Sequence, residues 1–319
     1  MTNNKLNFFV TLFCCIAIFL VLTNLNKIKS ILSELLEENP QVVIEKQNSY
    51  ALKQDFNYVQ ISKDFIPLSK QDLKNIIYTI IDNGWENFTF YCPNEYISCV
   101  QDLTEITDSQ ETITHLNNFV APYNSFSNLK TTILESGEIN IEIEYLYTEK
   151  QINAINKKVD EILKLVIKDD MDDYEKIKAI HDYIIEHSTY DVKRNNEKVS
   201  EYSSYLAYGP LIEGYATCNG YTDAMAIFLN KLGYKNYKIA TTPQNEDETG
   251  HIWNAVYLNG RWLHLDVTWD DPVSKNGKEY LLHKYFLITD EELEKADEGE
   301  VVVTEHQYLK RIYSEFLVK

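Results

Sequence analysis

The chain has 319 residues, of which 44% are hydrophobic and 25% charged. This is the composition of a globular protein, and it excludes disordered, collagen-like and multi-span membrane proteins. The formal net charge is −19, from 49 acidic and 30 basic residues. Because such a surface repels phosphate backbones, nucleic acid is not expected as a partner.

An apolar run near the N-terminus predicts a membrane anchor. Residues Phe8–Leu22 are apolar apart from Thr11. No small-residue cleavage site comes after it, so an uncleaved signal anchor over 1–29 is favoured over a cleaved signal peptide or a lipoprotein. A linker is expected over 30–56. Since a lone N-terminal anchor usually exports the rest of its chain, we expect a single-pass protein of the cell membrane with an extracellular catalytic domain.

The cysteines are too few and too unevenly spaced for a disulfide scaffold. Cys14 and Cys15 lie in the apolar run. Cys92 and Cys99 are close enough in sequence to pair in an oxidising compartment, although two free thiols are the simpler expectation. Cys218 stands alone and is therefore the thiol to consider for chemistry.

Residues 57–171 are predicted to form an N-terminal α+β subdomain. A helix is expected to begin after Ser69, its N-cap, and to end at Gly84. A short strand is expected at 88–91, and a second helix near 109–119.

The next elements lead into a predicted catalytic domain over 172–319. Period-two alternation predicts a half-buried strand over 139–147. Thr148 opens a capping box for the helix after it, and another helix is expected from Asp172. His181 borders the apolar stripe of that helix, where a histidine is more often structural than catalytic.

Cys218 is predicted to lie at the start of a helix. Apolar residues recur after it at helical spacing, and Gly233 ends the pattern. The free N–H groups and the positive dipole end there favour a thiolate, the nucleophilic form. Gly214 and Gly220 would let a substrate approach the backbone closely. The alternative is a buried structural thiol, which is common.

A hairpin supplies a base and a group that orients it. Asn259-Gly260 between alternating strands is the strongest short hairpin signal and indicates a type I′ turn. The two-residue loop fixes the register and puts His251 and Asp266 on one face, as diagonal neighbours within side-chain reach. The carboxylate can hold one imidazole nitrogen and leave the other for Cys218, which predicts a catalytic triad.

Other residues of the hairpin are given lesser roles. The strands are expected to span 251–258 and 261–268. Trp253 either walls the acyl site or packs beside the catalytic histidine, and His264 is interpreted as structural. Cys218, His251, His264 and Asp266 are suitable zinc ligands, but no C-x-x-C or H-x-x-x-H spacing supports a metal site, and no cofactor is expected.

Three blocks of residues, taken in order, resemble the transglutaminase-like superfamily, and its bacterial cell-surface branch most of all. They are Gly214–Tyr221, His251–Asn254 and Trp262–Pro272. The resemblance covers about 172–290. It implies an α+β, papain-like fold, in which a helix that carries the cysteine packs on an antiparallel sheet that carries the histidine and the aspartate.

The resemblance implies roles for individual residues. Cys218 is then the nucleophile, His251 the base and Asp266 the orienting carboxylate. Apart from the resemblance, Trp253, Tyr215 and Asn219 are expected to contact the substrate. Animal transglutaminases carry Trp directly after the cysteine, where this chain has Asn219, and no calcium-binding signature is evident.

The expected function is a cell-surface cysteine peptidase or amidase that forms an acyl-enzyme on peptide or carboxamide bonds. Its partner is a peptide or protein substrate, for which cell-wall peptides are one candidate. Two alternatives remain: a protein-crosslinking transglutaminase that transfers the acyl group of Gln to an amine, and a non-catalytic wall- or protein-binding module on the same fold.

Overall fold

The structure is a computed structural model that describes residue 59 and residues 65–197, 201–241, 250–272, 280–298 and 305–307. All of these belong to one compact unit, Glu45–Lys319. The predicted anchor over 1–29 and the linker over 30–56 lie outside the described residues. Within them, none of the helices has the length and apolar character needed to cross a membrane.

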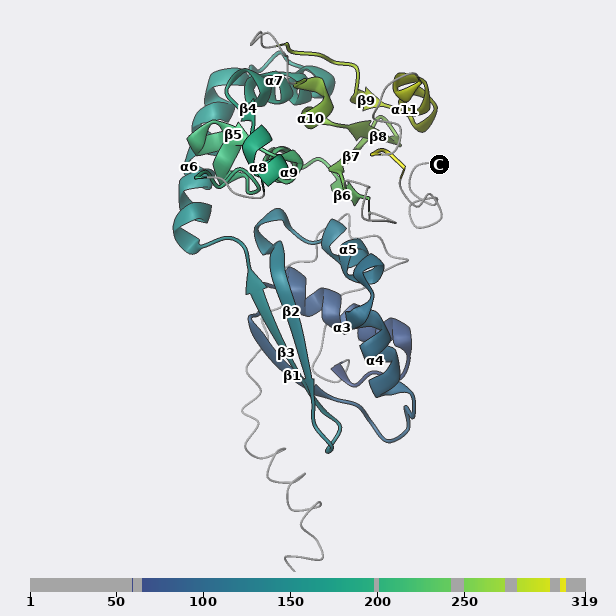
Figure 1. Cartoon of the computed structure of the whole chain (residues 1–319). Coiled ribbons are helices and arrows are strands. Elements are labelled where there is room, and N and C mark those ends of the chain that lie inside the picture. The colour runs from purple at the N-terminus through teal and green to yellow at the C-terminus, as the bar shows by residue number, and fades with distance from the viewer. Residues whose placement is uncertain are drawn as a thin grey trace, which may run out of the picture. The chain divides into compact units, whose positions relative to one another are not determined.

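The first half of the described chain is a three-stranded antiparallel sheet accompanied by helices (Figure 1). The strand order is β1-β3-β2, with bounds β1 Asn87–Tyr91, β2 Phe126–Ile133 and β3 Glu138–Tyr145. The helices are α3 Lys70–Asp82, α4 Cys99–Asp108 and α5 Gln110–Asn118, and a 3-10 turn at Pro122–Asn124 precedes β2.

These elements confirm the sequence predictions for the first half and add to them. The Ser69 hydroxyl accepts the Asp72 N–H and caps α3, as predicted. Helix α4 was not predicted. It begins at Cys99 and brings that residue back toward the end of β1, where Cys92 and Cys99 form a disulfide with their Cα atoms 5.8 Å apart. The expectation of two free thiols was therefore wrong.

The second half places helices against a four-stranded antiparallel sheet of order β6-β7-β8-β9. The strands are β6 Asn236–Ala240, β7 Ile252–Leu258, β8 Arg261–Leu265 and β9 Phe286–Ile288. The helices are α6 Glu149–Val166, α7 Asp173–Glu186, α8 Val192–Glu197, α9 Cys218–Leu232, α10 Val267–Asp270 and α11 Asp290–Asp297. A π-helical turn at Gly209–Glu213 and a short parallel pair, β4 Thr189–Tyr190 with β5 Tyr215–Ala216, complete it. The predicted capping box of α6 is present, and α7 begins with one as well.

Helix α9 lies at the centre of the hydrophobic core. Its buried residues share one apolar cluster with side chains from α6, α7 and the β6-β7-β8-β9 sheet. Ile155, Val159 and Ile162 of α6 belong to this cluster, so packing joins α6 to the second half, although the sequence analysis placed it in the 57–171 subdomain.

The start of α9 is held close to a neighbouring segment of backbone. A Cβ added at Gly220 would lie 2.2 Å from the carbonyl oxygen of Ser204. Gly220 is thus required for packing within the chain, and the expectation that it admits a substrate backbone was wrong. Thr217, the N-cap, donates its N–H to the same carbonyl oxygen at 2.8 Å. These contacts hold the start of α9 in place and so fix the direction in which the Cys218 side chain points.

The β7-β8 hairpin has the predicted register and turn. Leu258 pairs with Arg261, and Asn259 and Gly260 have φ of 52° and 83°, as a type I′ turn requires. The strand ends at Leu265, however, and its predicted continuation to 268 was wrong. Asp266 stops it, because its Oδ1 accepts the N–H groups of Thr268 and Trp269 at 2.9 and 3.2 Å and starts α10.

A buried polar network connects β6 with both halves. Lys238 and Asp223 are 3% and 7% exposed, and their Nζ and Oδ1 atoms lie 3.2 Å apart. The Lys238 ammonium also donates to the Ser125 hydroxyl at 2.9 Å. The hydroxyl of Tyr147 donates to Asp223 Oδ2 at 2.8 Å and accepts the Ala207 N–H at 2.8 Å. Each charge is therefore paired and hydrogen-bonded, which burial requires.

We predict that Lys238→Met lowers the free energy of unfolding by about 3–5 kcal/mol, because it leaves the Asp223 carboxylate buried without a cation. The double variant Asp223→Asn with Lys238→Met should recover part of this loss. Lys235→Met, at an exposed lysine of the same region, is the control and should change stability by less than about 0.5 kcal/mol. Urea unfolding measures all three. Equal losses in the single and double variants would contradict the assigned pairing.

Candidate active site

The thiol of Cys218 is free and half-buried at the first residue of α9, as predicted. The first N–H groups of a helix have no partners within it, and its dipole is positive at that end. A thiolate at this point, or an oxyanion formed beside it, would therefore be stabilised by the backbone.

The imidazole of His251 lies between Cys218 and a buried carboxylate. Its Nε2 is 2.5 Å from Asp266 Oδ2, and the two side chains are 3% and 1% exposed. The Nδ1 atom is left for the thiol side, where Glu305 Oε2 lies 3.9 Å away. The structure thus brings together the three residues that the hairpin register predicted.

The electrostatics of this pair favour an imidazolium. Burial lowers the pKa of His251, but the charge of Asp266 and its hydrogen bond, with a further contribution from Cys218, hold that pKa well above its ordinary value. Burial likewise raises the pKa of Asp266, and the charge and hydrogen bond of His251 more than offset this and hold that pKa below its usual range. The base is therefore stabilised in the protonated form that pairs with a thiolate.

His306 is a second imidazole partner of Asp266, which the sequence analysis missed. Its Nε2 is 3.0 Å from Asp266 Oδ2, and its Nδ1 is 2.8 Å from Asp297 Oδ1. Burial lowers the pKa of His306, but the hydrogen bonds that its ring donates to the two carboxylates raise it above its ordinary value. Forty residues separate His306 from Asp266. No local pattern could have linked them.

The residues expected to contact substrate have different surroundings. Asn219 lines the pocket that contains Cys218. Tyr215 is half-buried and stacks on Tyr202 at a ring distance of 4.0 Å. Trp253 is buried and stacks beside His251 with ring centroids 5.6 Å apart. Of the two roles predicted for it, the structure supports packing beside the histidine. The Nε1 of Trp253 donates to His264 Nδ1 at 3.0 Å, which makes His264 structural as predicted.

Tyr190 lies near the thiol, although the sequence analysis gave it no role. It belongs to β4, which pairs with β5 just before Cys218. Burial raises the pKa of its hydroxyl, and Cys218, Glu305 and Asp266 raise it further. The hydroxyl therefore stays protonated and can donate a hydrogen bond near the reacting sulfur.

Cys218 and His251 face a pocket of about 480 Å³. Its walls come from α5, the start of β2 and the ends of β6 and β7, as well as from Cys218 and His251. The lining residues are Gln110, Ile113, Thr114, Asn117, Asn118, Phe126, Ser127, Cys218, Asn219, Ala240, Thr241, Gly250, His251 and Ile252. Apart from the triad members, these side chains are uncharged. The site suits a neutral carbonyl substrate such as a peptide or carboxamide.

Two groups of described side chains have the spacing of metal ligands, His251 with Asp266 and His306, and His181 with Asp182 and His283. In the first group all three side chains are buried, so no side is open to an entering ion, and its His251 ring is the one that faces Cys218. The zinc set weighed from the sequence contains His264, whose ring nitrogens face Trp253 and Asp290 instead.

The pKa shifts predict a defined pH range for the contribution of Asp266 to stability. Because its folded pKa is lowered, the contribution is present above the unfolded value of about 3.9 and is lost as pH falls below it. The same contribution also depends on the protonated rings of His251 and His306. Because the folded-state pKa values of both rings are raised, this stabilisation is complete below the unfolded value of about 6.5 and is lost as pH rises through the folded-state values.

Asp266→Asn should therefore lower the free energy of unfolding by about 3–5 kcal/mol between about pH 4 and 6.5, and by less on either side. Urea unfolding across this range measures the difference. Asp160→Asn removes an exposed partner of Lys231 and should cost less than about 1 kcal/mol at every pH. A loss that does not vary with pH would contradict the ionic description.

Comparisons with known proteins agree with this geometry. A family model described as the transglutaminase-like superfamily matches residues 160–267. The kyphoscoliosis peptidase of Mus musculus is 26% identical over 150 residues, and that of Homo sapiens 28% over 120. These matches cover 43% and 35% of this chain but only 22% and 18% of the relatives, so the chain spans about a fifth of their length.

Two solved structures are also similar. One, described as a TGase, has a TM-score of 0.32 and 17% identity over 48% of this chain and 47% of that one. The other, a putative cysteine protease from Cytophaga hutchinsonii, has a TM-score of 0.28 and 13% identity over 49% of this chain and 65% of that one. The family match includes both Cys218 and the His251–Asp266 pair. The family match thus identifies residues 160–267 as a transglutaminase-like domain.

Proposed function

We propose that this protein is a cysteine peptidase or amidase that forms an acyl-enzyme on Cys218 and releases it with water. The observation that carries the proposal is the convergence of three groups from separate elements. The thiol of α9 and the imidazole before β7 line one pocket, and the buried carboxylate after β8 holds that imidazole. A nucleophile, a base and an orienting group in this relation are the requirements of nucleophilic acyl transfer.

Each side chain has a step in the reaction. The Cys218 thiolate attacks the carbonyl carbon, and the oxyanion that forms is stabilised by N–H groups at the start of α9. The His251 imidazolium then donates its Nδ1 proton to the leaving amine. In the second half, neutral His251 takes a proton from water as that water attacks the thioester. Asp266 holds Nε2 throughout and keeps the ring oriented.

The name of the mouse and human relatives, kyphoscoliosis peptidase, supports water over a lysine side chain as the acyl acceptor. Charge near the site does not separate the two acceptors. A carboxylate beside the thiol would attract an incoming lysine ammonium, and Glu305 Oε2 lies 3.9 Å from His251 Nδ1.

We further propose that the protein acts at the cell surface. The apolar run Phe8–Leu22 supports an N-terminal anchor. The disulfide between Cys92 and Cys99 supports the same location, since disulfides persist in oxidising compartments. Peptides or proteins of the cell wall or surface are then the substrates within reach.

We predict that His251→Ala slows the alkylation of Cys218 by iodoacetamide at least about tenfold, since the thiolate is the reacting form and the His251 imidazolium pairs with it. Peptide mapping by mass spectrometry follows Cys218 itself and separates it from Cys14 and Cys15. Asp266→Asn should give an intermediate rate. His187→Ala, at the end of α7, is the matched control and should react like the unaltered protein.

Equal alkylation rates in the unaltered protein and His251→Ala would contradict the proposed ion pair and leave a non-catalytic binding module. The choice of acyl acceptor is tested on the same protein with a peptide pool and a fluorescent primary amine. Hydrolysis creates new peptide C-termini or converts carboxamides to acids, and Cys218→Ala should abolish this. Incorporation of the amine in place of hydrolysis would instead support the crosslinking alternative.

A further inference from the structure

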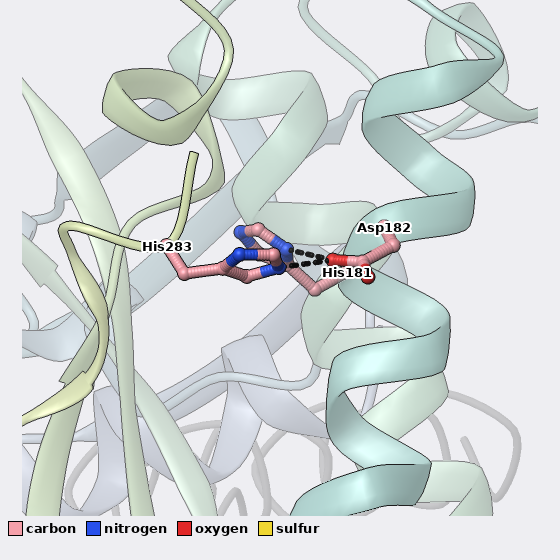
Figure 2. A group of neighbouring side chains, drawn as sticks. All are labelled: His181, Asp182 and His283. Atoms are coloured by element: carbon pink, nitrogen blue, oxygen red, sulfur yellow. Dashed lines mark hydrogen bonds and ion pairs between the residues drawn. The ribbon is translucent and has the colours of Figure 1, made fainter. Parts of the chain in front are cut away.

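A second cluster of ionisable side chains joins α7 to the segment before β9. Figure 2 shows the imidazoles of His181 and His283 directed at the same oxygen of Asp182. His181 Nδ1 lies 3.0 Å from Asp182 Oδ1, and His283 Nε2 lies 2.6 Å from it. Two histidines 102 positions apart thus meet at one carboxylate, a convergence that the triad does not use.

The three atoms have the chemistry and nearly the spacing of a metal site. Imidazole nitrogen and carboxylate oxygen are ligands for zinc and related divalent ions. All three lie within 4.8 Å of one another. In a tetrahedral site with bonds of about 2.0–2.1 Å, neighbouring ligand atoms are roughly 3.3 Å apart. The observed 3.0 and 2.6 Å would have to lengthen by less than about 1 Å.

The other nitrogen of His181 faces a buried carboxylate. Its Nε2 lies 3.2 Å from Asp270 Oδ2, and both side chains are fully buried. Asp270 is itself held in place, because its Oδ1 accepts the N–H of Tyr285 at 3.0 Å. A metal-bound histidine usually directs its second nitrogen at such a group, which fixes the ring and strengthens the ligand.

The cluster is open on one side. The side chains of Asp182 and His283 are 21% and 32% exposed, so an ion can enter and keep a water ligand. Lys178 lies 2.5 Å from Asp182, but on Oδ2, which leaves Oδ1 to the two imidazoles. The net charge of −19 favours cations near the surface.

We propose that His181 Nδ1, Asp182 Oδ1 and His283 Nε2 bind a divalent transition-metal ion of the zinc class. The ion ties α7 to the segment that leads into β9, with water at the fourth position. This site is separate from Cys218 and does not depend on the proposed peptidase activity.

Zinc binding to the full chain tests the proposal. A Cys218→Ala background removes the reactive thiol as a ligand, so the result does not depend on catalysis. Equilibrium dialysis followed by elemental analysis should show one zinc ion per chain that His283→Ala and Asp182→Asn remove. Asp270→Asn should weaken binding by about 10- to 100-fold through the orientation of His181. Cobalt in place of zinc should give the visible absorption of a tetrahedral site.

Two controls isolate the cluster. His187→Ala removes another histidine at the end of the same helix and should retain the zinc ion. His306→Ala disrupts the other group with ligand spacing and should also retain it. Zinc should raise the melting temperature of the background protein and not that of His283→Ala. Absence of zinc binding, or binding that survives both His283→Ala and Asp182→Asn, would overturn the proposal and leave a hydrogen-bonded cluster.

Discussion

The carboxylate of Asp266 is the point on which the candidate active site depends. One oxygen caps α10 through the N–H groups of Thr268 and Trp269. The other accepts hydrogen bonds from His251 and from His306. A carboxylate this deeply buried is tolerable only because every lone pair has a donor and two of the donors can carry positive charge. The same contacts end β8 and fix the direction of the His251 imidazole.

The sequence was sufficient to predict the parts of this arrangement that are local. Asn259-Gly260 sets the hairpin register, and the register decides which side chains share a face with His251. The helix that starts at Cys218 was likewise predicted from its capping residue and from the helical spacing of its apolar residues. Both predictions rest on interactions between residues that are close in the chain, where turn type, capping and side-chain periodicity determine the local geometry.

The parts that were missed or wrong depend on contacts made only after folding. His306 reaches Asp266 from a distant segment, and nothing in its own neighbourhood marks it. The strand predicted over 261–268 ends early because the Asp266 side chain accepts backbone N–H groups that would otherwise pair with a neighbouring strand. The alternation of hydrophobic residues does not indicate such a contact. Gly220 was predicted to let a substrate approach the backbone, but the group that packs against it is the backbone carbonyl of Ser204.

The pocket also gives the first half of the chain a place in the proposed chemistry. Helix α5 and the start of β2 supply uncharged polar and apolar side chains to the wall that faces Cys218. Lys238 holds the two halves in contact at Ser125, close to that wall. Selection among peptides would then depend on a surface that the family match over residues 160–267 does not include.

The proposed chemistry requires a protonated His251 held by Asp266, and NMR of the imidazole nitrogens observes this directly. In protein labelled with nitrogen-15 at histidine, the proton on His251 Nε2 should give a strongly deshielded resonance that persists above neutral pH. Asp266→Asn should remove it, and His306→Gln should shift it. A His251 that titrates near its ordinary value of about 6.5, with no such resonance, would contradict the central role of Asp266.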